Sequence, residues 1–223
     1  MQLVMPFGLS TSYEAADFIR GASNSDALTL IERWPDWPYS IVLVHGPKSS
    51  GKTHLAHAFA ARSRASFIAP ERIGSRVADQ LLIGNHAWVV DGVEEVRDAA
   101  ALAQLINLAR ARGDYLLLTA RAAAADLPIT LPDLRSRLLA LPAAALHAPD
   151  DALLMGVLAK HFADRQLRIA PEVLQLAAQH IERSYEAAHA FVRAMDGLSL
   201  ARGRAITVSL VREVLKNQSW QTP

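Results

Sequence analysis

The sequence predicts a three-layer α/β domain built on a parallel sheet, followed by a small all-helical C-terminal domain. Up to residue 148, short apolar runs typical of buried strands alternate with segments of helical composition. A glycine-rich turn joins the first strong apolar run to a helix, and after Pro149 apolar residues recur only at helical spacing. We therefore divide the chain into a mobile leader (1–12), an α/β domain (13–148) and a helical domain (149–223).

The strands and helices of the α/β domain are marked by apolar runs and by their boundary residues. Ser23 or Asn24 is expected to cap the first helix, which Pro35 ends, and Gly113 ends the fourth helix. The expected strands are 41–44, 66–69, 87–90, 115–119 and 143–148, and the expected helices are 24–34, 54–60, 75–83, 98–112 and 134–139. Aromatic residues at 34, 37 and 39 are interpreted as packing around the turn before the first strand, although they resemble a platform for stacking bases.

The helical domain begins where the strand pattern stops. Asp150 and Ser184 are expected to cap the first and third helices, while Pro171 and Thr207 start the second and fourth. The expected helices are 150–165, 171–181, 184–200 and 207–216.

Composition bounds the functions that this chain can have. Its 223 residues, 51% of them hydrophobic, suffice for one substantial domain and a smaller one. The net charge of +1 and the lack of a basic run give little support for strong nucleic-acid binding, so any DNA contact is expected to be indirect. The absence of cysteine excludes disulfides, and the eight histidines have no metal-ligand spacing. No signal peptide or membrane-spanning run is evident, so we expect a cytoplasmic protein without membrane contact.

The glycine-rich turn has the P-loop pattern G-x-x-x-x-G-K-[ST]. Because it lies between a strand and a helix, its backbone N–H groups are expected to converge on the helix N-terminus, where a phosphate is favoured. Lys52 is expected to reach the β- and γ-phosphates of ADP or ATP, and the Thr53 hydroxyl to bind Mg²⁺. A chance glycine turn is the alternative, but two of the four lysines lie in this loop. The candidate loop residues are Gly46, Pro47, Lys48, Ser49, Ser50, Gly51, Lys52 and Thr53.

Two polar residues follow later strands of the predicted sheet. Asp91 comes directly after 87–90, at the strand end where parallel sheets bind ligands, and is a candidate for holding Mg²⁺ or its water shell. The alternative is that Asp91 only opens the turn with Gly92. Thr119 ends the next strand and could contact the γ-phosphate or the attacking water; equally, its hydroxyl could bond only to backbone.

The order of these features resembles that of AAA+ ATPases. A P-loop, a strand-end Asp, a strand-end Thr, arginines and a helical lid follow one another as in that class. Within it, the chain resembles the DnaA-related family, most closely the short regulatory inactivators of DnaA, the Hda group. Four segments carry the likeness: 17–24 before the P-loop, 51–58 at the P-loop helix, 131–138 with its arginines, and the leader 2–7.

The resemblance implies roles for further residues. Phe18 and Ile19 would border the adenine, and His54 would belong to the nucleotide-binding helix start. Arg137 would be an arginine finger that acts in trans on ATP held by DnaA. The leader would bind the sliding clamp of DNA polymerase III, whereas its composition alone favours a frayed terminus. The clamp-binding residues would be Gln2, Leu3, Met5, Pro6 and Phe7.

The chain also departs from the family pattern. Gly92 occupies the position of the second acid that polarises the attacking water, and Glu94 and Glu95 are expected to lie beyond the turn. Glu186 aligns with a lid arginine that senses nucleotide, with Arg183 as the nearest replacement, and a carboxylate there would repel phosphates. The resemblance therefore implies a protein that binds nucleotide, ADP more readily than ATP, hydrolyses it poorly, and activates a partner's ATPase.

Two other functions are weighed against this regulator of replication initiation. A DnaA-like initiator or helicase loader acting directly on DNA is less favoured, because no helix-turn-helix segment follows the helical domain. A small P-loop kinase is less favoured because no cluster for binding a metabolite is evident. Homodimer formation is left open.

Overall fold

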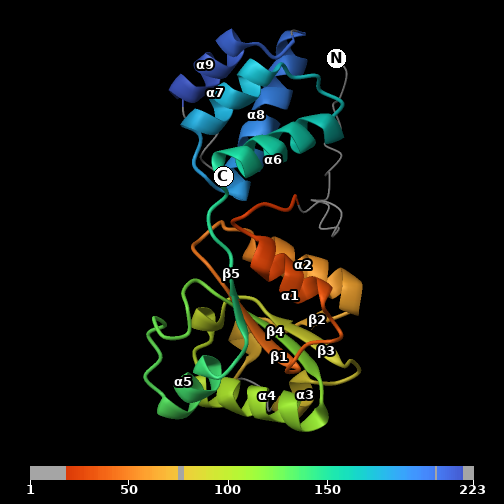
Figure 1. Cartoon of the computed structure of the whole chain (residues 1–223), viewed down its shortest axis with the longest axis vertical. Helices are drawn as coiled ribbons and strands as arrows, with labels where there is room; N and C mark the ends of the chain where they lie inside the picture. The colour runs from red at the N-terminus through yellow and green to blue at the C-terminus, as the bar shows by residue number, and fades with distance from the viewer. Residues whose placement is uncertain (1–18, 75–77, 204, 218–223) are drawn as a thin grey trace.

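The computed structural model describes residues 19–74, 78–203 and 205–217. Five strands form one parallel sheet in the order β2-β3-β4-β1-β5 (Figure 1). The strands are β1 (Ile41–His45), β2 (Ser66–Phe67), β3 (Ala87–Val90), β4 (Tyr115–Ala120) and β5 (Ala143–Ala145). Because all pairs are parallel, the carboxyl ends of the strands share one edge of the sheet, where ligands of such sheets bind.

Helices cover both faces of the sheet. Along β1, Val42 and Val44 pack in a cluster with helices α1 and α2, whereas Ile41 and Leu43 pack in a cluster with α4 and α5. This alternation follows from the two-residue period of a strand and gives the three layers that the sequence predicts. The helices are α1 (Ser25–Glu32), α2 (Lys52–Ser63), α3 (Ala78–Leu81), α4 (Ala99–Arg112) and α5 (Pro132–Leu139).

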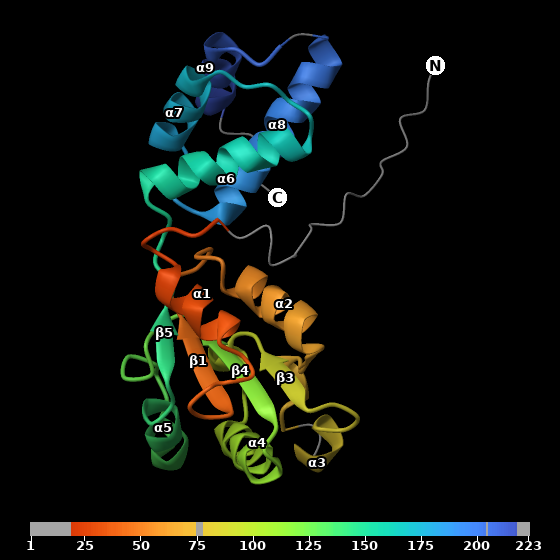
Figure 2. The same cartoon turned by 45° about the vertical axis from the view of Figure 1, so that its right-hand side comes forward.

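A block of four helices follows β5 and stands beyond the carboxyl edge of the sheet (Figures 1 and 2). Its own core includes the fully buried Phe162, Phe191 and Met195. As expected, the side chains of Asp150 and Ser184 cap the first and third helices by accepting backbone hydrogen bonds. The helices of this helical block are α6 (Asp151–Asp164), α7 (Pro171–His180), α8 (Tyr185–Arg202) and α9 (Val208–Asn217).

The observed elements follow the predicted order and differ mainly at their ends. The last strand stops at Ala145 instead of 148. The helix expected over 75–83 is described only as α3, since residues 75–77 lie outside the described part. Asn24 precedes α1 but does not cap it; its Oδ1 accepts from Gly21 N at 2.8 Å and its Nδ2 donates to Ile19 O at 2.9 Å. Asn24 does not cap α1 because its side-chain amide bonds to the backbone of the turn before it.

Two of the three aromatic residues before β1, Trp34 and Trp37, pack as predicted, whereas Tyr39 is exposed. Trp37 is buried and stacks on Phe59 of α2, with ring centroids 5.1 Å apart. Its indole nitrogen donates to Leu30 O at 2.6 Å. Trp34 contacts the edge of the same Phe59 ring. These rings therefore stabilise α1 against α2 and do not form an exposed platform.

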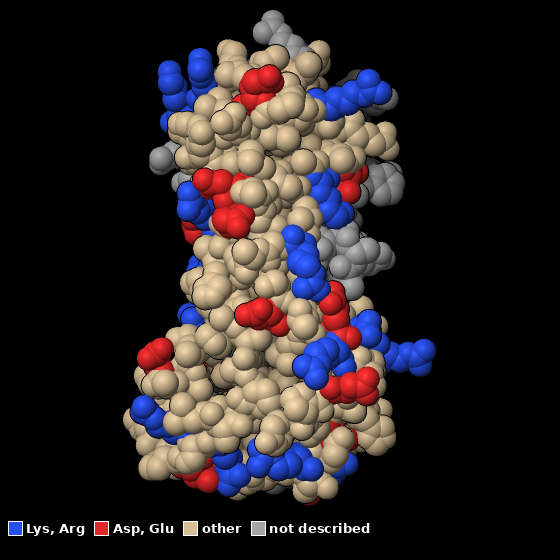
Figure 3. Space-filling model, in the orientation of Figure 1, with Lys and Arg blue, Asp and Glu red and all other residues tan. Residues whose placement is uncertain are grey.

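The surface charges, the helix lengths and the placement of acidic and histidine side chains add three observations. On the face shown in Figure 3, acidic and basic side chains are interspersed over both the sheet domain and the helical block. None of the helices in the described ranges is both long and apolar enough to cross a membrane. Within those same ranges, no group of three or more His, Asp or Glu side chains is placed to hold a metal ion.

Candidate nucleotide-binding site

The glycine-rich loop connects β1 to α2, and two of its glycines are required by geometry. A Cβ atom on Gly46 would lie 2.0 Å from the carbonyl oxygen of Leu146, so the backbone there leaves no room for a side chain. Gly51 has φ +98°, in the left-handed region, and directly precedes the first helical residue, Lys52. The loop therefore delivers the start of α2, the end of a helix that favours anions, to the carboxyl edge of the sheet.

The Lys52 ammonium is folded back onto the loop. Its Nζ donates to Gly46 O at 2.8 Å and to Pro47 O at 2.7 Å. Burial lowers the pKa of Lys52, and the negative charges of Glu94 and Asp91 act in the opposite direction. The ammonium thus lies beside the cavity and bonds to neutral carbonyls, which a phosphate oxygen can replace with a stronger, charge-assisted contact.

Asp91 gathers the hydroxyls of the two threonines that the sequence singled out. Thr53 Oγ1 donates to Asp91 Oδ2 at 2.7 Å, and Thr119 Oγ1 donates to Asp91 Oδ1. The Thr119 hydroxyl also accepts from Gly92 N at 2.8 Å and is almost fully buried. Asp91 therefore does more than open a turn, since it accepts hydrogen bonds from both threonines. Thr119 both bonds to the backbone, through Gly92 N, and lines the cavity.

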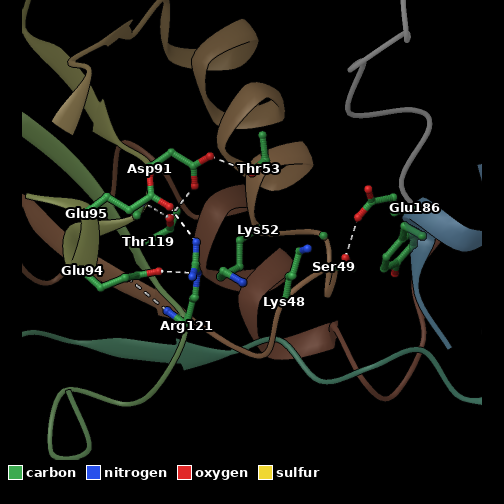
Figure 4. A pocket seen from close by; sticks show the side chains of 13 residues that line it. Lys48, Ser49, Lys52, Thr53, Asp91, Glu94, Glu95, Thr119, Arg121 and Glu186 are labelled. Carbon is green, nitrogen blue, oxygen red and sulfur yellow. Dashed lines mark hydrogen bonds and ion pairs between the residues drawn. The ribbon is translucent and has the colours of Figure 1, made fainter. Parts of the chain in front are cut away.

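The cavity at this edge has a volume of about 430 Å³ and lies between the loop, the ends of β3 and β4, and the start of α8 (Figure 4). It is lined by Lys48, Ser49, Gly51, Lys52, Thr53, Asp91, Gly92, Glu94, Glu95, Thr119, Arg121, Tyr185 and Glu186. Of the predicted loop set, Gly46, Pro47, Ser50 and His54 do not line it. Phe18 lies outside the described residues, as do Gln2, Leu3, Met5, Pro6 and Phe7 of the leader.

The expectation that Glu94 and Glu95 lie beyond the turn is wrong. Gly92 has φ +86°, and the short 3-10 helix η3 (Val93–Glu95) after it returns both carboxylates to the cavity. There they flank Arg121: its Nε lies 3.0 Å from Glu94 Oε1 and its Nη2 lies 2.7 Å from Glu95 Oε1. Arg121 was not identified as a site residue from the sequence. Its position directly after the end of β4 was the one feature of the sequence that could have indicated it.

The helical block contributes a carboxylate to the opposite wall of the cavity. Ser49 Oγ donates to Glu186 Oε2 at 2.7 Å, which joins the loop to the first turn of α8 (Figure 4). Ser49 has φ +60°, an uncommon conformation for a residue with a side chain. Glu186 therefore faces the loop, as its alignment implied, while Arg183 is ion-paired with Asp151 at 2.8 Å.

Beside Glu186, Tyr185 ties the helical block to the segment that precedes α1. Asn24 Nδ2 donates to the Tyr185 hydroxyl at 3.1 Å as well as to Ile19 O. Burial raises the pKa of Tyr185, and its hydrogen bond with Asn24 opposes that shift. Ile19 packs against the core of the helical block. Of the two residues expected to border the adenine, the structure describes Ile19. Ile19 is thus held close to Tyr185, which lines the cavity.

Arg137 does not line this cavity; it belongs to α5, which lies at the end of the sheet away from the helical block (Figures 1 and 2). Its Nη2 lies 2.8 Å from Asp133 Oδ1, its Nε donates to Asp133 Oδ2 at 3.0 Å, and its Nη1 donates to Asn107 Oδ1. The Arg137 side chain is 26% exposed and that of Asp133 is 56% exposed. The guanidinium is therefore held at the surface of its own molecule, in a pair that water reaches.

These features define the class of the fold. A P-loop between β1 and α2, an acid after β3, a hydroxyl at the end of β4 and a helical block after β5 accompany the sheet order β2-β3-β4-β1-β5. The fold is that of the AAA+ domains of DnaA and RuvB.

Solved structures of DnaA and RuvB are similar to this chain over most of its length. Domain III of the replication initiation protein DnaA from Thermotoga maritima is similar over 93% of this chain and 97% of that one, with TM-score 0.79 and 16% identity. AMPPCP-bound DnaA from Aquifex aeolicus matches 88% of this chain and 68% of that one, with TM-score 0.73 and 15% identity. The R170A form of RuvB from Thermotoga maritima matches 92% of this chain and 72% of that one, with TM-score 0.73 and 14% identity. No protein-family model and no curated protein matches the sequence.

Proposed function

We propose that this chain is a regulator of chromosomal replication initiation that stimulates ATP hydrolysis by DnaA, together with the sliding clamp, through Arg137. The observation that carries the proposal is the position of Arg137 on a DnaA-like fold. The residue lies at the surface of α5, at the end of the molecule away from its own cavity (Figure 2). An arginine in that position has no access to its own nucleotide and is suited to a neighbouring molecule.

The cavity is proposed to hold ADP or ATP with Mg²⁺. Thr53 and Asp91 fit this ion, because they offer a hydroxyl and a carboxylate oxygen to one cavity, and Mg²⁺ is commonly held by one or two protein oxygens with water and phosphates. Once bound, the ion would neutralise charge on the phosphate oxygens. Lys52 would contribute its ammonium, and the loop its N–H groups. AMPPCP bound to two of the similar DnaA structures supports a nucleotide here.

The nucleotide is proposed to be held rather than turned over. Gly92 supplies no carboxylate, and both nearby glutamates are ion-paired with Arg121. Glu186 faces the loop from the other wall and disfavours additional negative charge. We therefore expect the purified chain to contain or bind ADP and to hydrolyse ATP near the background rate. Nucleotide extraction and a basal ATPase assay check this, and brisk hydrolysis without a partner would contradict it.

Stimulation of DnaA follows from ordinary phosphoryl-transfer electrostatics. Negative charge on the transferred group must be neutralised, and a guanidinium supplied by a second molecule does this without chemistry of its own. For Arg137 to act, its guanidinium must leave Asp133 and Asn107 for the phosphate of the partner. The Asp133 carboxylate is more than half exposed, so water competes for it, and a phosphate offers the guanidinium a bidentate, charge-assisted contact in place of these bonds.

The experiment that tests the proposed function uses ATP-bound DnaA, clamp loaded on DNA and the full chain. Faster ATP hydrolysis that requires both clamp and chain is expected. If instead the chain leaves hydrolysis unchanged and binds duplex DNA tightly and in a salt-sensitive manner, the alternative of an initiator or helicase loader acting on DNA is favoured.

The leader is proposed to dock on the clamp. Such tethering raises the effective concentration of the chain near DNA-bound DnaA and makes a weak direct contact sufficient. Replacing Gln2 and Leu3 by alanine is expected to lower clamp affinity about tenfold or more, since docked peptides depend on a few anchor residues. Surface plasmon resonance with immobilised clamp measures this, with Ser10→Ala as the control. Unchanged clamp binding would remove the leader from the mechanism.

A further inference from the structure

Arg121 lines the candidate nucleotide cavity, and no motif accounts for it. It follows β4 directly and lines the cavity together with Lys52 and Thr119 (Figure 4). Its guanidinium bonds to Glu94 and Glu95, and its backbone N–H donates to Glu94 Oε2 at 3.3 Å. A guanidinium in this place lies at the side of the cavity where Asp91 and the P-loop lysine meet.

The two glutamates hold Arg121 with unequal firmness. The turn at Gly92 and the buried Val93 fix η3, and the Glu94 side chain is only 15% exposed. The side chains of Glu95 and Arg121 are 55% and 57% exposed, so their pair is screened by water and weak. Glu94 is therefore held more firmly than Glu95, and the Arg121 side chain, which is more than half exposed, has room to move its guanidinium as a unit from the glutamates into the cavity.

The cavity is lined by more carboxylates than cations, which favours movement of the guanidinium toward a bound phosphate. Four carboxylates line the cavity, those of Asp91, Glu94, Glu95 and Glu186, against the three cationic side chains Lys48, Lys52 and Arg121. A polyphosphate that enters must find cations, and Arg121 forms stronger, bidentate bonds to phosphate oxygens than to an exposed carboxylate. Arg121 and Lys52 line the same cavity, and besides burial the Arg121 charge acts to lower the pKa of Lys52.

We infer that Arg121 is a phosphate-binding residue for nucleoside triphosphates, which Glu94 and Glu95 hold in reserve until the terminal phosphate arrives. This inference rests on the proposed nucleotide binding and adds a residue that distinguishes ATP from ADP. Arg121 lies on the side of Asp91 and Thr119, where the proposed cation and the end of the phosphate chain belong, and away from Glu186 on the opposite wall (Figure 4). A nucleoside diphosphate would leave Arg121 with its glutamates.

Calorimetric titration of the full chain with ADP and with AMPPCP, both with Mg²⁺, tests the inference. Arg121→Gln is expected to weaken AMPPCP binding about tenfold while ADP affinity stays within about twofold, since a charge-assisted bond to the third phosphate is lost. Glu95→Gln is expected to strengthen AMPPCP binding about threefold, because it releases the guanidinium. Arg97→Gln is the control: Arg97 is exposed, close in sequence, and absent from the cavity wall.

The outcomes separate this inference from the proposed function. Equal losses for ADP and AMPPCP in Arg121→Gln, no loss, or weaker AMPPCP binding in Glu95→Gln would make Arg121 a counter-ion only and overturn the inference. Wild-type chain that binds neither nucleotide would overturn nucleotide binding itself, and with it the role of Arg121. Stimulation of DnaA through Arg137 is read in a separate assay and is unaffected by either result. Thermal unfolding of each variant shows that it is folded.

Discussion

Replacing Arg137 by alanine is expected to return ATP hydrolysis by DnaA to its unstimulated rate, a loss of about 10³-fold or more if the residue acts as an arginine finger. The reason is electrostatic: without the guanidinium, charge that develops on the transferred phosphoryl group is left without its second cation. The measurement is release of phosphate from ATP-bound DnaA in the presence of loaded clamp.

The contacts of Arg137 supply the controls for this experiment. Arg135 lies on the same helix, is exposed and donates to Ala125 O at 3.2 Å, so Arg135→Ala removes the same charge from α5 and should retain stimulation. Asp133→Asn weakens the ion pair that holds Arg137 and should leave stimulation unchanged or raise it a few-fold, about what an exposed pair is worth. An Arg137→Ala variant as active as wild type would rule out the finger assignment.

Replacing Gly46 by alanine is expected to destabilise the sheet domain by about 3 kcal/mol, the upper end of the cost of overpacking. The added Cβ would lie 2.0 Å from the carbonyl oxygen of Leu146, a backbone atom that cannot rotate away. The unfolding midpoint should fall by roughly 6–12 °C for a chain of this size. The loop would also shift, so nucleotide affinity should fall by about tenfold or more because its phosphate contacts depend on hydrogen-bond geometry.

The matched control is Gly197→Ala in α8. A Cβ there meets nothing within 4 Å, and alanine in a helix interior is favoured over glycine by about 1 kcal/mol, so this variant should be as stable as wild type or slightly more so. Differential scanning fluorimetry with and without ADP compares the two. A Gly46→Ala chain with unchanged midpoint and affinity would show that the contact between the loop and Leu146 is not tight in solution.

Much of the fold could be predicted because its signals are local. The run from Ile41 to Val44 is apolar throughout, as a strand buried on both faces must be, and a glycine ends it. The meeting of Asp91 and Thr119 could also be predicted, since parallel strands place their carboxyl ends at one edge. In both cases the pattern and the packing that it requires lie within a few residues.

The contacts that sequence reasoning missed join distant residues or depend on one backbone angle. Whether Glu94 faces the cavity depends on the positive φ of Gly92. A glycine permits this angle, but its presence in the sequence does not predict it. Arg121 belongs to no motif, and its long side chain could have pointed elsewhere. The bond from Ser49 to Glu186 spans 137 positions in the chain, and the bond from Arg137 to Asn107 spans 30. Such pairings follow from how the layers pack, which the pattern of one segment does not encode.

The first turn of α8 has a mechanical consequence. Tyr185 and Glu186 hold this end of the helix to Asn24 and Ser49, and the helix runs from there for 18 residues, about 27 Å along its axis. Because α8 packs in the core of the helical block, a tilt of about 10° at this turn would carry the block with it and move Arg202 by about 5 Å. Because α9 packs against α7 and α8, an event as small as the loss of one serine hydrogen bond would be magnified at the outer surface of the helical block.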